Sequence, residues 1–161
     1  AQGQSTPPSW VIWAGRYVHF LFLDWAVQLK AQGNEEIIEC NLCGACAMAS
    51  WVLCKVLRDL GEEPVFCYSN WEAHSWVEWN GWVLDPTATQ FNRRHRKLRY
   101  LKINSRKWKK DMYTERWAGL KALKLCNSSM SPCSPREHRT RLETMAREIV
   151  AARRTACLSR N

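Results

Sequence analysis

Residues 73–91 place a histidine and an aspartate where they could act together on a cysteine. The stretch reads AHSWVEWNGWVLDPTATQF, with the dipeptide Asn80-Gly81 between two apolar runs. Asn-Gly in that setting is typical of a two-residue type I′ hairpin turn. A surface hairpin needs neither the histidine nor the aspartate, whereas a cysteine nucleophile uses an imidazole that a carboxylate orients. The stretch therefore raises the question of whether a suitable cysteine exists.

The hairpin turn predicts how the two strands pair. With Asn80 and Gly81 in the turn, the predicted pairs are Trp79 with Trp82, Val77 with Leu84, Trp76 with Asp85 and His74 with Thr87. His74 and Asp85 then share one face as diagonal neighbours, roughly 7–8 Å apart at the backbone. That separation lets an imidazole and a carboxylate meet.

The sequence Cys43-Gly44-Ala45-Cys46 offers two candidate nucleophiles. Cys46 opens an apolar run with helical spacing, so the unpaired amides and positive dipole end of that helix would stabilise its thiolate. Cys43 falls one turn too early, in the preceding connection. Gly44 allows a tight approach to the helix and close passage of a substrate backbone. Cys46 is therefore the predicted nucleophile.

The predicted cysteine helix, histidine strand and aspartate strand, in this order, resemble the transglutaminase-like branch of the papain-like cysteine protease superfamily. The matching segments are Cys46 with Ser50 four residues on, a helix ending at Leu60-Gly61, the run His74-Ser75-Trp76-Val77-Glu78, and the run Trp82-Val83-Leu84-Asp85-Pro86-Thr87. The resemblance covers residues 43–91, about a third of the chain. Animal transglutaminases are several times longer and carry calcium sites. This chain has no acidic metal loop, so we expect no calcium activation and no cofactor.

The resemblance implies a fold class and a catalytic triad. The expected fold is α+β and papain-like/transglutaminase-like, with a nucleophile helix packed on a small antiparallel β-sheet and flanking helices. Cys46, His74 and Asp85 are the expected catalytic residues. The expected substrate-binding residues are Trp71, Trp76, Gly44 and Gln90. The backbone amide of Cys46 is the expected first oxyanion donor, with Asn41 or a tryptophan as second.

The remaining cysteines leave a metal or disulfide interpretation open. Cys40-x2-Cys43-x2-Cys46 has metal-ligand spacing, and Cys126 with Cys133 or His138 could complete a zinc set. A disulfide between Cys43 and Cys46, or between Cys40 and Cys43, is a further alternative. Cys54 and Cys67 lie in apolar runs and are expected to be small buried hydrophobic residues. Catalysis without a metal is the preferred interpretation, and a reducing, cytoplasmic compartment is favoured.

The charge is concentrated in one segment. The chain has a formal net charge of +9, and residues 93–110 contain ten Lys or Arg and no acid. Such a segment suits a solvated loop or a docking surface for an acidic protein partner, a membrane or nucleic acid. Nucleic acid ranks last as a partner because no groove-reading motif is present. No transmembrane segment is expected, because Arg16, His19 and Asp24 interrupt the most apolar stretch.

The chain is long enough, at 161 residues, for one domain with one core. We expect a flexible leader over 1–9 and a single domain over 10–161, with the Cys/His/Asp core at 40–91. The expected elements are helices over 10–30, 46–60, 113–125 and 135–157, strands over 64–69, 74–79 and 82–85, and loops over 93–110 and 126–133. The first helix is expected to pack through Trp13, Tyr17, Phe20, Leu21 and Trp25.

The function predicted from the sequence is thioester-forming acyl transfer on a protein or peptide substrate that carries a carboxamide. Protease, amidase, deamidase and transglutaminase activities all fit, and a bacterial toxin or effector domain is a compatible setting. Two alternatives remain: a catalytically inactive module that binds a protein partner, and a basic nucleic-acid-binding domain.

Overall fold

The computed structural model describes residues 4–34, 36–39, 42–92, 94–128 and 133–159. Within these ranges the fold is α+β, with four α-helices and a five-stranded antiparallel sheet. The helices are α1 (Ser9–Ala31), α2 (Cys46–Asp59), α3 (Leu120–Ser128) and α4 (Arg139–Leu158). The strands are β1 (Val65–Ser69), β2 (His74–Trp79), β3 (Trp82–Asp85), β4 (Arg99–Lys102) and β5 (Trp117–Ala118).

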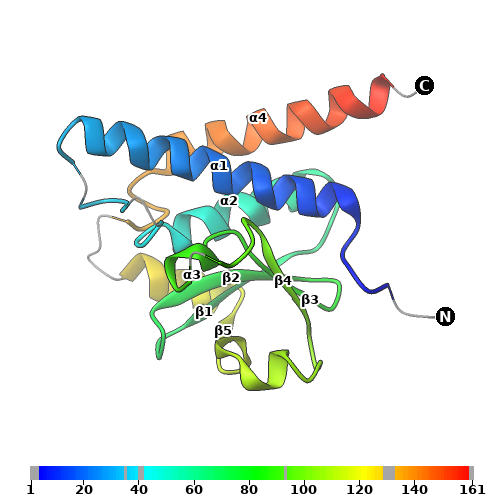
Figure 1. Ribbon diagram of the computed structural model, residues 1–161. Helices are drawn as coiled ribbons and strands as arrows, with labels where there is room; N and C mark the ends of the chain where they lie inside the picture. Colours follow the sequence, from blue (N-terminus) through cyan, green and yellow to red (C-terminus); the bar gives the residue numbers. More distant parts are fainter. Residues whose placement is uncertain (1–3, 35, 40–41, 93, 129–132, 160–161) are drawn as a thin grey trace.

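The sheet has the strand order β4-β3-β2-β1-β5, and helices cover one of its faces. In Figure 1, α2 lies between the sheet and the pair α1 and α4, while the short helices η2 (Trp108–Lys110) and η3 (Met112–Thr114) lie on the other side of the sheet. The two catalytic candidates on the sheet are thus placed between two layers.

The β2–β3 hairpin forms in the predicted register. Trp79 pairs with Trp82 and Val77 with Leu84. The turn residues Asn80 and Gly81 have φ values of 46° and 79°, as a type I′ turn requires. The hairpin prediction is confirmed, and with it the expectation that His74 and Asp85 share a face.

Helix α2 is also close to its prediction. Leu60 caps the helix, and Gly61 follows with a φ of 90°, the left-handed conformation in which helices commonly end. Ala49, Ser50, Leu53, Val56 and Leu57 are buried, as their helical spacing indicates. This burial fixes α2 on the sheet and so fixes the position of its first residue, Cys46.

Helix α1 packs through a different face from the predicted one. Its buried stripe consists of Val11, Ala14, Gly15, Val18, His19, Phe22, Trp25, Ala26 and Leu29. Of the five residues predicted to face inward, only Trp25 is buried, whereas Trp13 and Phe20 are exposed. The aromatic residues misled the prediction, because the smaller residues at 11, 14, 15 and 18 allow the closer approach to the core. The helix also starts at Ser9, within the predicted leader.

The region after the basic segment differs most from its prediction. No single helix spans 113–125: η3, β5 and α3 occupy it and the residues that follow. Trp117 and Leu120, whose apolar spacing would place them on the inner face of a helix over 113–125, are exposed. Helix α3 continues to Ser128, so the predicted loop over 126–133 starts late, and residues 129–132 lie outside the described residues. The helix over 113–125 was predicted from the spacing of apolar residues. Gly119, with a φ of 66°, lies between β5 and α3 and separates the two elements.

Helix α4 begins at Arg139, four residues later than the predicted start at 135. A turn joins Ser134 to Glu137, and His138 is the N-cap of the helix. One face of the helix packs into the core, with Leu142, Met145, Ala146, Ile149 and Val150 all buried.

Candidate active site

Cys46 is the first residue of α2 and lies against the start of β2. No side chain of the described residues caps the helix at Ala45. The amides of the first turn therefore remain available to a negative charge. The Sγ of Cys46 lies 3.9 Å from the carbonyl oxygen of Ala73, the residue before the candidate base His74. Ala73 has a φ of 47°, so the turn that enters β2 is sharp enough to bring the strand to the helix end.

His74 begins β2 and is fully buried. Its Nε2 lies 2.7 Å from Asp85 Oδ2, which leaves Nδ1 as the nitrogen for exchange with a thiol. Burial by itself lowers the pKa of His74, but the charge and hydrogen bond of Asp85, together with its contact with Cys46, raise it above the ordinary range. A histidine with a raised pKa carries a proton at neutral pH, which is the state that stabilises a neighbouring thiolate.

Asp85 ends β3 and is fully buried, and both of its oxygens are used. Oδ2 accepts from His74 and from the Tyr113 hydroxyl at 2.7 Å each. Oδ1 accepts from the backbone amide and the hydroxyl of Thr87, at 3.0 and 3.3 Å. Burial favours the neutral acid, but the His74 charge and these hydrogen bonds lower the pKa of Asp85 below its usual range. The carboxylate is therefore ionised and held in one orientation.

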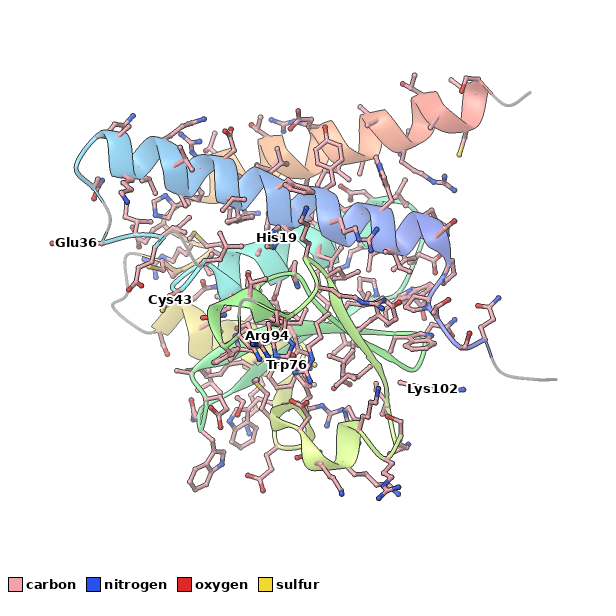
Figure 2. All side chains as sticks on the ribbon, viewed as in Figure 1. His19, Glu36, Cys43, Trp76, Arg94 and Lys102 are labelled. Carbon is pink, nitrogen blue, oxygen red and sulfur yellow. The ribbon has the colours of Figure 1, made fainter. Side chains whose placement is uncertain are left out.

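The turn after Asp85 is attached to the helical layer through His19. His19, labelled in Figure 2, is a buried residue of α1. Its Nδ1 lies 2.8 Å from the carbonyl oxygen of Pro86. Burial lowers the pKa of His19, so the neutral ring donates to that carbonyl. Helix α1 thus holds the turn that follows Asp85, and His19 has a structural role.

Aromatic rings enclose the imidazole of His74. Trp76 stacks beside it with ring centroids 6.1 Å apart, and Phe91 meets it edge to face at 4.7 Å. Trp76 in turn contacts Tyr113 edge to face at 5.0 Å. Because Trp76 is fully buried, it supports the histidine ring and has no surface to offer a substrate, contrary to the prediction.

Gly44 allows the tight approach to α2 that was predicted for it. Its φ is 87°, and an added Cβ would lie 2.7 Å from the carbonyl oxygen of Ile37. The backbone that passes close to this glycine is therefore the chain's own, which explains why no side chain is present there. Gly44 positions the entry to α2, and through it Cys46.

Gln90 and Trp71 lie where a substrate could meet them. Gln90 Nε2 is 3.1 Å from His74 Nδ1 and 3.2 Å from Thr87 Oγ1, so the amide nitrogen is engaged by these two residues. Trp71 is 83% exposed in the turn between β1 and β2 that ends at Ala73. It lines a surface pocket of about 470 Å³ together with Asn70, Glu115, Arg116 and Trp117.

The other cysteines are separated by their surroundings. Cys54 and Cys67 are buried as predicted, and burial raises the pKa of Cys54 to about 12 and that of Cys67 higher still. Cys43 is exposed, yet partial burial and the charge of Glu39 raise its pKa as well. These three thiols stay protonated at neutral pH.

Neither the metal nor the disulfide interpretation is seen in the described part of the chain. No group of three His, Cys, Asp or Glu side chains there could hold a metal ion, and no disulfide joins the described cysteines. Cys40 and Asn41, the latter proposed as an oxyanion donor, lie outside the described residues.

The basic segment, residues 93–110, was predicted to be a loop but contains a strand. Strand β4 lies within it and pairs with β3, placing Arg99 opposite Asp85. The exposed cations among its described residues are Arg94, Arg96, Lys97, Lys102, Arg106, Lys107, Lys109 and Lys110. Across the described residues, the search for a helix that could cross a membrane found none.

Sequence reasoning missed Tyr113 and Arg99 as neighbours of the triad. No local pattern marks Tyr113, and only the pairing of β4 with β3 brings Arg99 to Asp85. Comparison of the chain with known protein families, with characterised proteins and with solved structures found no match.

Proposed function

We propose that this chain is a cysteine-dependent acyl-transfer enzyme with the triad Cys46, His74 and Asp85, as its resemblance to the transglutaminase-like enzymes implies. One observation carries the proposal: the buried His74–Asp85 bond of 2.7 Å, beside a cysteine at a helix N-terminus. An ion pair of this kind is costly to bury without a compensating use. A base oriented by a carboxylate beside a thiol supplies that use.

The first half of the proposed reaction forms a thioester. His74 takes the proton of the Cys46 thiol, and the sulfur attacks the carbonyl carbon of a carboxamide or peptide bond. A C–S bond forms, and the carbonyl electron pair moves onto oxygen, where the amides at the start of α2 can stabilise it. When that pair returns, the C–N bond breaks. The departing nitrogen takes the proton from His74 and leaves as ammonia or an amine.

The second half releases the acyl group. His74 removes a proton from water or from a second amine, which attacks the thioester carbon. The C–S bond breaks, and the sulfur leaves as a thiolate facing the protonated His74. Water yields a carboxylic acid, and an amine yields a new amide. Asp85 stays ionised throughout, and it holds the imidazole and stabilises its charged form.

The substrate class is a protein or peptide that carries a carboxamide. Trp71 offers an exposed indole in the turn that leads to His74, and Gln90 offers an amide close to the imidazole. The exposed cations of residues 94–110 would favour acidic surroundings around the substrate carboxamide, or an acidic protein partner.

The test is selective alkylation of Cys46, read by mass spectrometry after brief exposure to iodoacetamide at about pH 6. An ordinary thiol with a pKa near 8.5 is only about 0.3% thiolate at that pH, so we expect His74→Ala to slow labelling of Cys46 on the order of 10²-fold. His74→Gln serves as a second variant of similar volume. Circular dichroism must show both to be folded.

The matched control lies in the same loop. Cys43 is more exposed than Cys46 but has a raised pKa, so it should remain unlabelled, and Cys43→Ala should leave labelling of Cys46 unchanged. Equal labelling of the two, or none in a fully reduced and metal-free sample, would contradict the proposal. That result would favour an inactive module that binds a protein partner.

A further inference from the structure

Tyr113 lies directly behind the aspartate of the candidate triad, and no part of the reaction above uses it. It belongs to η3, on the sheet face opposite the helical layer, and it is fully buried. Its hydroxyl donates to Asp85 Oδ2 at 2.7 Å, the same oxygen that accepts from His74 Nε2. The shared oxygen couples the tyrosine to the imidazole through a single atom.

Arg99 orients the hydroxyl group of Tyr113. Arg99 Nη1 lies 3.5 Å from the Tyr113 hydroxyl oxygen and donates toward it, so the hydroxyl hydrogen is free to turn to Asp85. The guanidinium is held by a two-pronged ion pair with Asp111, whose nearer bond joins Nη2 to Oδ2. Asp111 also caps η3 by accepting from the amide of Met112. One carboxylate thus fixes both the arginine and the short helix that carries the tyrosine.

We propose that Tyr113 is a positioning residue of the triad, and that Arg99, from the basic segment, orients its hydroxyl. The proposal rests on the function proposed above, and it gives the basic segment a role inside the molecule. In this arrangement hydrogen bonds run in one direction, from Arg99 to Tyr113 to Asp85. The donor at Oδ2 withdraws negative charge from the carboxylate and limits how strongly it holds the proton of His74.

Among the described residues, the charged and titratable groups that face this network lie on α2, on four strands and just before η3. Cys46 approaches from α2, His74 and Glu78 lie on β2, Asp85 on β3, Arg99 on β4, Cys67 on β1, and Asp111 just before η3. Glu78 is paired with Arg116 at 2.6 and 2.8 Å, so its charge is balanced locally. Burial and the charge of Asp85 raise the pKa of Tyr113, so it remains a donor at every working pH.

The expected effect of removing the hydroxyl follows from its sign. A hydroxyl that donates to Asp85 weakens the hold of the carboxylate on the His74 proton, so Tyr113→Phe makes the imidazole hold its proton more tightly. The pKa of His74 rises, and half-maximal alkylation of Cys46 moves to lower pH, because the protonated imidazole stabilises the thiolate. A purely structural role for Tyr113 would lower stability but leave both titrations in place.

The first measurement is the NMR titration of the His74 imidazole in the Cys46→Ala protein, where no thiolate contributes. Adding Tyr113→Phe should raise the midpoint by about 0.5–1 pH unit, because the loss of one hydrogen bond of typical net strength corresponds to roughly that shift. Tyr100→Phe is the matched control. Tyr100 pairs with Leu84 on the opposite face of the sheet, and its hydroxyl accepts from the exposed Arg96, so no shift is expected.

Arg99→Lys is a second variant that keeps the positive charge and loses the planar fork. It should shift the His74 midpoint in the same direction by a smaller amount, because the hydroxyl of Tyr113 remains but is less well oriented. An unchanged midpoint in both Tyr113→Phe and Arg99→Lys, with both proteins folded, overturns the positioning role.

The second measurement is the pH profile of Cys46 alkylation in proteins that retain the cysteine. It separates failure of this proposal from failure of the acyl-transfer function. If Cys46 shows no selective labelling but the His74 titration moves, the function fails and the positioning role stands. If Cys46 labels selectively while neither the titration nor the profile moves, the function stands and Tyr113 is structural.

Discussion

The two faces of the sheet contain the same strands but differ in what they bury. Against α1 and α2 the sheet presents Phe66, Val77, Trp79, Trp82 and Leu84, which belong to the large apolar core. The opposite face presents His74, Trp76, Glu78 and Asp85, covered by Tyr113 and the basic segment. Neighbours along one strand, such as Leu84 and Asp85, therefore serve different purposes. The apolar face determines whether the protein folds, and the polar face determines what its histidine and cysteine can do.

The first prediction breaks the apolar face alone and has the largest expected effect. Leu84→Ala removes a fully buried side chain, so we expect the unfolding free energy to fall by about 2–5 kcal/mol. The measurement is urea unfolding, with the exposed Val27→Ala as a control that should change stability by less than about 0.5 kcal/mol.

The rate of Cys46 alkylation in folded Leu84→Ala protein should stay within about twofold of wild type, since this substitution leaves the partners of Asp85 in place. A loss of alkylation as large as that of a triad substitution would show that the two faces do not act separately.

How well the sequence predicted each face depended on the range of its signals. The hairpin was predictable because Asn80-Gly81 specifies a turn, and the turn alone determines the register. Helix α2 was predictable because its apolar spacing and Gly61 agree. Both signals are local. Together they place His74 and Asp85 on one face of the hairpin and Cys46 at the start of α2.

The rest of the site depends on contacts between distant segments. Strand β4 lies in a run of cations, where alternation is visible only once Tyr100 is known to face Trp82. Tyr113 meets Asp85 across 28 residues of chain, and His19 meets Pro86 across 67. Such pairings have no periodic signature, so the sequence indicated the candidate triad but not the residues that surround it.

The second prediction breaks the polar face alone. Asp85→Asn keeps the shape of the side chain but removes the charge that stabilises protonated His74. We expect alkylation of Cys46 at about pH 6 to slow by roughly 10- to 10²-fold, measured as a rate constant by mass spectrometry. An unchanged rate would mean that the thiolate does not depend on the aspartate.

The same variant should change how stability depends on pH. The pKa of Asp85 is lowered by folding, so its contribution is present above the ordinary aspartate value of about 3.9 and is lost as pH falls through the lower folded value. The pKa of His74 is raised, so its contribution is present below about 6.5 and is lost as pH rises through the folded value. The advantage of wild type over Asp85→Asn should therefore be greatest between these limits, and urea midpoints across that range measure it.

The third prediction has the smallest expected effect and sharpens the comparison within the polar face. The Gln90 amide can donate to His74 Nδ1 only while that nitrogen is unprotonated, so the bond stabilises the neutral ring. Gln90→Ala should move half-maximal alkylation of Cys46 to lower pH by about half a unit, the same direction as Tyr113→Phe. Thr89→Ala, in the same turn, is the control and should leave the profile unchanged. The two donors act on opposite sides of one imidazole: Tyr113 acts through the carboxylate, and Gln90 acts on the nitrogen that exchanges its proton with Cys46. Each donor favours the neutral ring, so a shift to higher pH in either variant would show that general loosening of the site, and not the charge state of His74, sets the reactivity of the thiol.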